Sequence, residues 1–183
     1  MLLFKTKWII LKIHKVQEKD FLYTIFTEDY WKIMCQKKLT SREKSLDIGY
    51  LIHFEIETKE DRKVHKMRHI KILSEFSLSK KTYHEMESYL KLLAYAWKQA
   101  PDWVPVYQVL EIFEEVHNYT NITAEKLLLA RLKLSSIFWN LPQEYGNETT
   151  KKILWFVHKN KISQILKLTG ISEEIKKELE SIF

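Results

Sequence analysis

Apolar and polar residues alternate along the first part of the chain with the two-residue period of β-strands. The segment YLIHFEIE, residues 50–57, places aromatic and branched apolar side chains at every second position. The segment FLYTIFT, residues 21–27, is apolar at nearly every position, which indicates a strand covered on both faces. Together these patterns predict five strands, at residues 7–14, 21–27, 31–36, 50–57 and 64–73.

Polar segments separate the five strands, and the longest of them, residues 37–49, follows the third strand. Five short strands with one longer connection at this place are typical of a small closed barrel, for which an OB-fold is the leading prediction. In the last strand, strict alternation predicts that Lys66 and Arg68 face one side and Lys71 the other.

The period changes to that of an α-helix near Leu78. Thr82 and Glu85 have the spacing of a capping box and therefore mark the start of a first helix. The helix predicted over residues 124–140 is apolar nearly all round, so it is expected to be the central buried one, ended by Pro142. The other predicted helices lie at residues 106–116, 150–159, 162–169 and 173–181.

These patterns predict an α+β protein, β then α, with two domains. Residues 1–77 are expected to form a basic, five-stranded, OB-fold-like barrel, and residues 78–183 a charge-neutral, all-α helical bundle. The chain has 183 residues, of which 45% are hydrophobic, so it is long and apolar enough to bury a core.

The net charge of +6 comes entirely from residues 1–80. Residues 1–80 contain 17 Lys or Arg against 11 Asp or Glu, whereas residues 81–183 contain 13 of each. A basic part joined to a neutral part is typical of a protein that binds a polyanion through its basic part.

The scarcity of glycine and cysteine excludes several kinds of site. Three glycines are too few for a Gly-rich phosphate loop, and a single cysteine excludes an internal disulfide and a CxxC zinc site. Cys35 lies in an apolar strand and is expected to be a buried, unreactive thiol. No catalytic motif stands out, so we predict a protein that is not an enzyme and that uses no cofactor, metal or small-molecule substrate. The lack of a recognisable secretion signal or membrane span predicts a cytoplasmic protein without a membrane partner.

Basic residues gather in two clusters of the predicted barrel, one after the third strand and one along the last hairpin and strand. Tyr30 and Trp31 stand beside the first cluster, where their rings are placed to stack on bases. The alternative is that the lysines only keep the protein soluble. The predicted nucleic-acid-binding residues are Tyr30, Trp31, Lys32, Lys37, Lys38, Arg42, Lys44, Arg62, Lys63, Lys66 and Arg68.

The segment EKDFLYTIFTEDYWK, residues 18–32, resembles the RecO family of recombination mediators. Many members carry, early in the barrel, a pattern close to G-E-x-D/S-x-L-x-T-x-F-T-x-x-x-G-K. The segment ARLKLSSIFWNLP, residues 130–142, is similar to the family's F-E-L-x-L-L-x-x-x-G-x-x-P segment, which ends on the same proline. The first pattern is matched here by Glu18, Asp20, Leu22, Thr24, Phe26, Thr27 and Lys32.

The sequence also departs from that family. Trp31 and Trp139 replace two of its glycines, and the four-cysteine zinc motif found in part of the family is absent. The resemblance therefore implies a short, divergent member that binds and anneals single-stranded DNA in recombination and DNA repair. Its implied partners are single-stranded DNA, a RecR-like protein and single-strand-binding protein, and no covalent chemistry is implied.

Other interpretations stay open on the residues alone. An OB-fold module of another family would bind RNA or a protein partner, and a small enzyme would assemble its site from residues that the sequence does not group. The segment at residues 161–180 also resembles a helix-turn-helix, but its second helix carries four glutamates and two lysines, which opposes insertion into a DNA groove. Whether Trp31 and Trp139 lie in the core or at the surface is left open as well.

Overall fold

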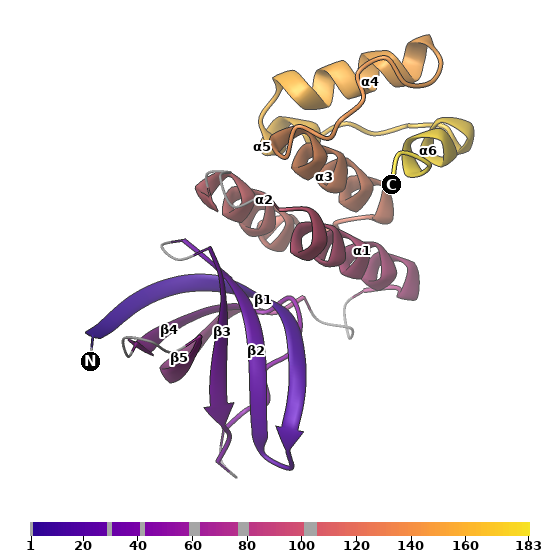
Figure 1. The fold of residues 1–183 in the computed structure, drawn as a ribbon. Helices are drawn as coiled ribbons and strands as arrows, with labels where there is room; N and C mark the ends of the chain where they lie inside the picture. Colours follow the sequence, from indigo (N-terminus) through magenta and orange to yellow (C-terminus); the bar gives the residue numbers. More distant parts are fainter. Residues whose placement is uncertain (1, 29–30, 41–42, 59–62, 77–80, 101–105) are drawn as a thin grey trace. The chain divides into compact units, whose positions relative to one another are not determined.

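The computed structural model describes residues 2–28, 31–40, 43–58, 63–76, 81–100 and 106–183, without the side chains of residues 2–4, 31, 58 and 106. The chain divides into two compact units, Met1–Phe76 and Ser77–Phe183, which are described separately. The described strands all lie in the first unit and the described helices all lie in the second (Figure 1). The predicted α+β class, with a barrel followed by helices, is therefore confirmed.

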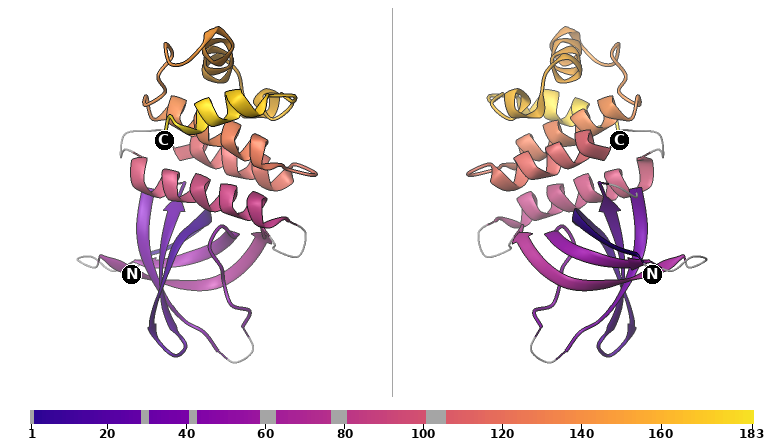
Figure 2. Two further views of the ribbon diagram at one scale, coloured as in Figure 1. Left: turned by 90° about the vertical axis from the view of Figure 1, so that its right-hand side faces the viewer. Right: turned by 90° about the vertical axis from the view of Figure 1, so that its left-hand side faces the viewer.

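The first unit is a closed barrel (Figure 2). Its strand order is β1-β2-β3-β5-β4, and β4 pairs back to β1. Neighbouring strands are antiparallel, except for β3 and β5, which run parallel. The five predicted strands are all present, and the first begins earlier and ends later than predicted. The strands are β1 (Leu2–Gln17), β2 (Asp20–Thr27), β3 (Trp31–Lys38), β4 (Leu51–Thr58) and β5 (Val64–Ser74).

The barrel interior is filled by the apolar side chains that alternate along each strand. Burying one such side chain contributes about 1.5–3 kcal/mol relative to leaving it in water, so the row of alternating residues dominates the stability of this unit. Phe26 is also fully buried although it has the opposite parity on β2, which agrees with the prediction that this strand is covered on both faces. The inward, buried residues include Trp8, Tyr23, Ile25, Ile52, Phe54, Ile56 and Met67.

The second unit is organised around α3 (Ala124–Ile137), which packs against each of the other five described helices. Seven residues of α3 are buried on several sides of the helix, as its nearly continuous apolar sequence predicted. The predicted fifth helix is much shorter than expected and ends at Ile165. The other helices are α1 (Tyr83–Gln99), α2 (Val106–Asn118), α4 (Glu148–Lys159), α5 (Ile162–Ile165) and α6 (Glu173–Glu180).

The first helix begins with the predicted capping box. The backbone N–H of Glu85 donates to Thr82 Oγ1 at 3.3 Å, and the backbone N–H of Thr82 donates to Glu85 Oε2 at 2.7 Å. Each side chain thus satisfies a backbone donor that the helix itself leaves without a partner.

The third helix ends differently from the prediction, which placed its end at Asn140 and attributed it to Pro142. The helix stops at Ile137 because Trp139 adopts a left-handed backbone conformation, with φ of +61°. The N–H groups of Trp139 and Asn140 donate to the carbonyls of Ser136 and Ser135, a Schellman arrangement. Glycine usually occupies this position, and here an 82% exposed tryptophan does, so Trp139 is a surface residue.

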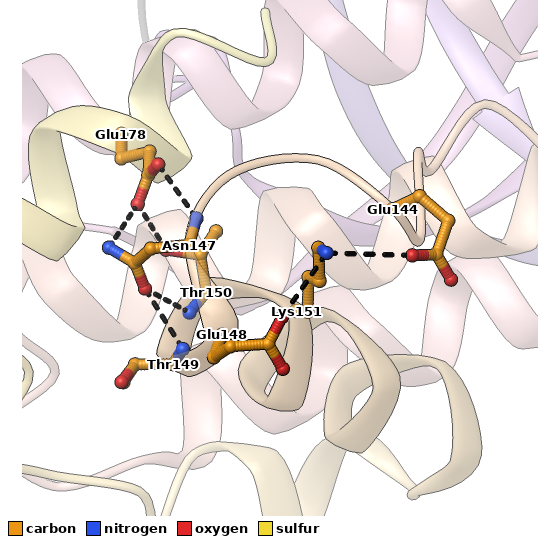
Figure 3. A network of polar contacts seen from close by, with 7 residues as sticks. All are labelled: Glu144, Asn147, Glu148, Thr149, Thr150, Lys151 and Glu178. Carbon is orange, nitrogen blue, oxygen red and sulfur yellow. Dashed lines mark hydrogen bonds and ion pairs between the residues drawn. The ribbon is translucent and has the colours of Figure 1, made fainter.

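A carboxylate ties the C-terminal helix α6 to the start of α4 (Figure 3). Glu178 accepts hydrogen bonds from the backbone N–H of Asn147 at 3.0 Å, from Asn147 Nδ2 at 2.9 Å, and from the hydroxyl of Thr150. Asn147 is also the N-cap of α4, because its Oδ1 accepts from the N–H groups of Thr149 and Thr150. The negative charge of Glu178 therefore lies at the positive end of the α4 dipole.

Replacing Gly146 by alanine is expected to destabilise the second unit by about 2–4 kcal/mol. Gly146 has φ of +82°, and an added Cβ would come within 2.7 Å of Glu178 Oε1 and 2.8 Å of Thr150 Cγ2. The left-handed conformation costs a non-glycine residue about 1–2 kcal/mol, and the steric conflict adds roughly 1–2 kcal/mol. Urea denaturation followed by circular dichroism measures the loss.

Gly170→Ala is the matched control for this prediction. Gly170 has a similar φ of +78°, but nothing lies within 4 Å of the position of an added Cβ. Its substitution should cost only the backbone strain, about 1–2 kcal/mol. Equal losses for the two variants would show that the contact with Glu178 does not limit the space at Gly146.

Candidate nucleic-acid interface

The alternation of β3 places the two adjacent lysines of the first basic cluster on opposite faces of the barrel wall. Cys35, which is fully buried, faces inward opposite Tyr23 of β2. Lys37 shares the inward parity of Cys35 and its side chain is only 16% exposed, whereas Lys38 faces outward and is exposed. Only Lys38 of this pair is therefore presented on the outer surface.

Lys37 is engaged by a carboxylate from the connection after β3. Its Nζ lies 2.6 Å from Glu43 Oε1, and the backbone N–H of Thr40 donates to Glu43 Oε2 at 2.7 Å. The hydrogen bond from Lys37 and that from Thr40 lower the pKa of Glu43 to about 2. The pair fastens the connection to the end of the barrel.

Glu43→Gln is expected to reduce the acid sensitivity of the barrel. The pKa of Glu43 is lowered from 4.5 to about 2 in the folded protein, so its contribution to stability is complete above pH 4.5 and is lost as the pH falls to 2. The glutamate is 38% exposed, so this contribution is below about 1 kcal/mol. Between these pH values the wild-type protein should lose stability more steeply than Glu43→Gln in urea titrations.

Glu114→Gln provides the comparison for this pH experiment. Glu114 is exposed and forms no ion pair with another described residue, whereas Glu43 pairs with Lys37. Glu114→Gln should follow the wild-type pH dependence. If Glu43→Gln does so too, the Lys37–Glu43 pair has no role in acid stability.

Two more predicted binding residues are held by carboxylates. Lys44 forms an ion pair with Glu75, and the hydrogen bond from that pair raises the pKa of Lys44. Arg68 Nη2 lies 2.6 Å from Glu57 Oε2, at an angle that lacks hydrogen-bond geometry, so this attraction is coulombic. Both cations remain half or more exposed, at 62% and 52%, and can still meet a phosphate at the surface.

A β-bulge in β5 changes the face on which its last lysine lies. His53 pairs with Lys71, whereas Glu55 pairs with Arg68, so β5 has one residue more than β4 between these two pairs. His69, at the bulge, has φ of +49°. The prediction that Lys71 faces away from Lys66 and Arg68 was therefore wrong, because the extra residue returns Lys71 to the outer side.

The bulge completes a straight row of basic residues across three strands. Lys7 of β1 pairs with His53 of β4, which pairs with Lys71 of β5. Directly paired residues of antiparallel strands are about 4.5–5.5 Å apart and point to the same face, so the row is roughly 10 Å long. Two residues before Lys7 on β1, Lys5 lies opposite Glu55, with 3.8 Å between Lys5 Nζ and Glu55 Oε1.

We call the outward basic side chains of β1, β3 and β5 the outer cationic face. Its residues are Lys5, Lys7, Lys38, Lys66, Arg68 and Lys71. The strands that carry it are neighbours in the order β3, β5, β4, β1, and Gln36 of β3 pairs with Lys66 of β5. Two carboxylates, Glu55 and Glu57, share the outer side of β4. A third carboxylate, Asp20 of β2, pairs directly with Lys38 and so points to the same side. Six basic residues against three acidic ones leave a net charge of +3 on this face with its histidines neutral.

The histidine of the bulge is bound to one of those carboxylates. His69 Nδ1 lies 2.7 Å from Glu55 Oε2, and this hydrogen bond is the main cause that lowers the pKa of Glu55. The contact with Lys5 acts in the same direction. Glu55 is thus kept ionised and occupied within the outer cationic face.

The remaining predicted binding residues have various positions. Lys63 and Lys66 are exposed and Lys32 is half-buried. Trp31 begins β3, but its side chain is not among those described. Tyr30, Arg42 and Arg62 lie outside the described residues. The structure therefore brings together Lys38, Lys66 and Arg68 from the predicted set.

The basic clusters predicted from the sequence did not contain Lys5 and Lys7, and the predicted binding residues did not include Lys71. The signal for the first two was present, because Lys5 and Lys7 alternate with Thr6 and Trp8, which are both buried. Such a pattern indicates a strand with one basic and one buried face. Nothing in the sequence marked the bulge that moves Lys71, since no glycine stands at that place.

The Cys35 thiol and the Tyr23 hydroxyl are buried in the barrel interior. Burial raises the pKa of the Cys35 thiol to about 12 and, with a contribution from Glu43, the pKa of Tyr23 to about 12 as well. Cys35 is therefore protonated and shielded at neutral pH, as expected for an unreactive thiol. Within the described residues, no three His, Cys, Asp or Glu side chains converge as metal ligands.

Comparison with known proteins adds no relative. No protein-family model matches the chain, and no curated protein matches it. Among the described helices, none has both the length and the apolar character needed to cross a bilayer.

Proposed function

We propose that the first unit is an OB-fold module that binds single-stranded nucleic acid on its outer cationic face. A five-stranded closed barrel of this kind is a common scaffold for that task, although fold alone does not decide function. The observation that carries the proposal is the row Lys7–His53–Lys71, continued by Lys66 and Lys38 on neighbouring strands. Cations spaced along a wall at this density suit a chain of phosphates.

Phosphate contacts explain which kind of binding is expected. Each phosphate that a lysine neutralises releases counterions, so affinity should fall steeply with salt and depend little on sequence. Four lysines of this face are exposed: Lys7, Lys38, Lys66 and Lys71. None of them forms an ion pair with another described residue. They can therefore meet phosphate without first breaking a described salt bridge.

The wider role that we propose is that of a RecO-like recombination mediator. Supporting this role are the residue patterns at 18–32 and 130–142 and the order of a basic barrel followed by a neutral helical unit. In this role the protein anneals single-stranded DNA in the cytoplasm, acts with a RecR-like protein and single-strand-binding protein, and performs no covalent chemistry. An OB-fold module that binds RNA or a protein partner is the alternative.

Fluorescence anisotropy with labelled oligo-dT tests the binding proposal. The wild-type protein should bind the single strand at low salt and bind a duplex of equal length more weakly. The logarithm of affinity should fall with the logarithm of salt concentration, with a slope of about −0.7 for each phosphate neutralised. Absence of binding at low salt would refute the proposal, whereas tighter binding of oligo-U than of oligo-dT would favour the RNA alternative.

A further inference from the structure

A second basic site lies in the second unit, in a hollow of about 270 Å³ between α2, the end of α3 and the junction of α4 and α5. Lys133, Lys159 and Lys161 line it, with Glu111 as the one carboxylate among its described lining residues. Because residues 81–183 are charge-balanced overall, this excess of positive charge is a local feature. The hollow belongs to a single unit and shares no residue with the outer cationic face.

Lys133 is the most constrained of the three lysines. Its ammonium donates to the backbone carbonyls of Val157 at 3.1 Å and His158 at 3.3 Å, at the end of α4, where helix carbonyls lack partners. An ammonium has three N–H donors, so one remains for the hollow. Burial lowers the pKa of Lys133, against the attraction of Glu111. A partly desolvated cation of this kind gains from an incoming anion.

The other two lysines of the hollow are not engaged by a carboxylate among the described residues. Lys159 and Lys161 are exposed, and neither forms an ion pair within the described residues. They flank Asn160, whose side-chain amide donates to the carbonyl of Phe156 at 2.8 Å and thereby fixes this corner of the chain. Three ammonium groups around one hollow provide the donors that an anion with several oxygens requires.

An exposed aromatic ring completes the lining. Tyr107, at the start of α2, is 62% exposed, and its hydroxyl accepts a hydrogen bond from Gln108 Nε2 at 3.2 Å. Its ring face is available to a flat partner, and stacking of a base on an aromatic side chain is worth about 1–3 kcal/mol. The hollow is slightly below the usual range for ligand pockets, about 300–1,000 Å³, so its ligand is small.

We propose that this hollow binds the phosphate group of a nucleotide through Lys133, Lys159 and Lys161, with the base placed against Tyr107. A free nucleoside monophosphate and the phosphorylated end of a nucleic-acid strand present the same chemistry to it. The inference is independent of the proposed function of the barrel, because every residue involved belongs to the second unit.

Isothermal titration calorimetry with the full chain tests the proposal. Adenosine 5′-monophosphate should bind, and adenosine and inorganic phosphate should each bind at least tenfold more weakly, because each lacks one half of the contacts. The double variant Lys159→Gln, Lys161→Gln should weaken binding of the monophosphate roughly tenfold or more, the equivalent of one charge-assisted hydrogen bond. Both side chains are exposed, so the fold should persist.

Lys152→Gln, Lys167→Gln is the matched control, since it removes the same charge from exposed positions of the same unit outside the hollow. It should bind as the wild type does. The proposal is overturned if the monophosphate does not bind at millimolar concentration, if inorganic phosphate binds equally well, or if both double variants behave alike. The source of the phosphate is identified in a protein whose outer cationic face carries the charge reversals. If this protein binds a 5′-phosphorylated oligonucleotide more tightly than the monophosphate, the ligand is the end of a strand. If it binds the monophosphate more tightly, the ligand is the free nucleotide.

Discussion

Reversing Lys7, Lys66 and Lys71 to glutamate is expected to weaken binding of oligo-dT strongly at low salt and to flatten its salt dependence. These three lysines lie on β1 and β5, face outward, and are exposed. Each phosphate contact on a single strand contributes about −0.7 to the slope of log affinity against log salt, so losing three contacts changes the slope by roughly 2. The added carboxylates also repel the strand, which lowers the affinity itself.

The control for this reversal is the triple variant of Lys98, Lys152 and Lys167 to glutamate. These lysines are exposed in the second unit, and the variant has the same net charge as the outer-face variant. It should keep the wild-type slope. If the two triple variants lose affinity equally, only the total charge of the protein matters, and the outer cationic face is not a specific interface.

Leu132→Asp is expected to unfold the second unit. Leu132 is fully buried in α3, the helix that packs against all the other described helices. A charge without a partner in such an environment costs several kcal/mol, and the cavity left by the leucine adds about 2–5 kcal/mol. The sum approaches the entire stability of a small domain, about 5–15 kcal/mol. Circular dichroism should show loss of helix while strand signals of the barrel persist.

Leu90→Asp gives the comparison for that variant. Leu90 lies on α1 and is 47% exposed, so an aspartate there keeps contact with water and should cost only about 1 kcal/mol or less. A soluble Leu132→Asp protein that melts cooperatively, near the wild-type temperature, would contradict the central position of α3.

Most of the fold follows from periodicity. Strands β2 and β4 were predicted within one residue of their observed starts, because their buried aromatic and branched residues recur at every second position. The first strand was predicted too short, at residues 7–14, whereas β1 spans Leu2–Gln17 and includes Lys5 and Lys15 beyond the predicted ends. In the barrel β1 pairs with both β2 and β4, and its lysines occupy the exposed side of a long, bulged strand.

Features that depend on a single residue's backbone angle could not be predicted. The left-handed conformations of His69 and Trp139 stand where glycine is the usual residue, so no glycine in this sequence marks the bulge or the early helix end. The bulge decides that Lys71 joins the outer cationic face. Likewise, the ion pair of Lys37 with Glu43 depends on the path of a connection, which composition alone does not show.

The most direct test of the outer cationic face is to titrate isotope-labelled protein with oligo-dT and to follow backbone amide shifts by NMR. We predict that the largest shifts occur at outward residues of β1, β4 and β5, in the row of Lys7, His53 and Lys71, while the inward residues Tyr23 and Cys35 change little. Shifts confined to residues 81–183, or no shifts at all at low salt, would contradict binding by the barrel.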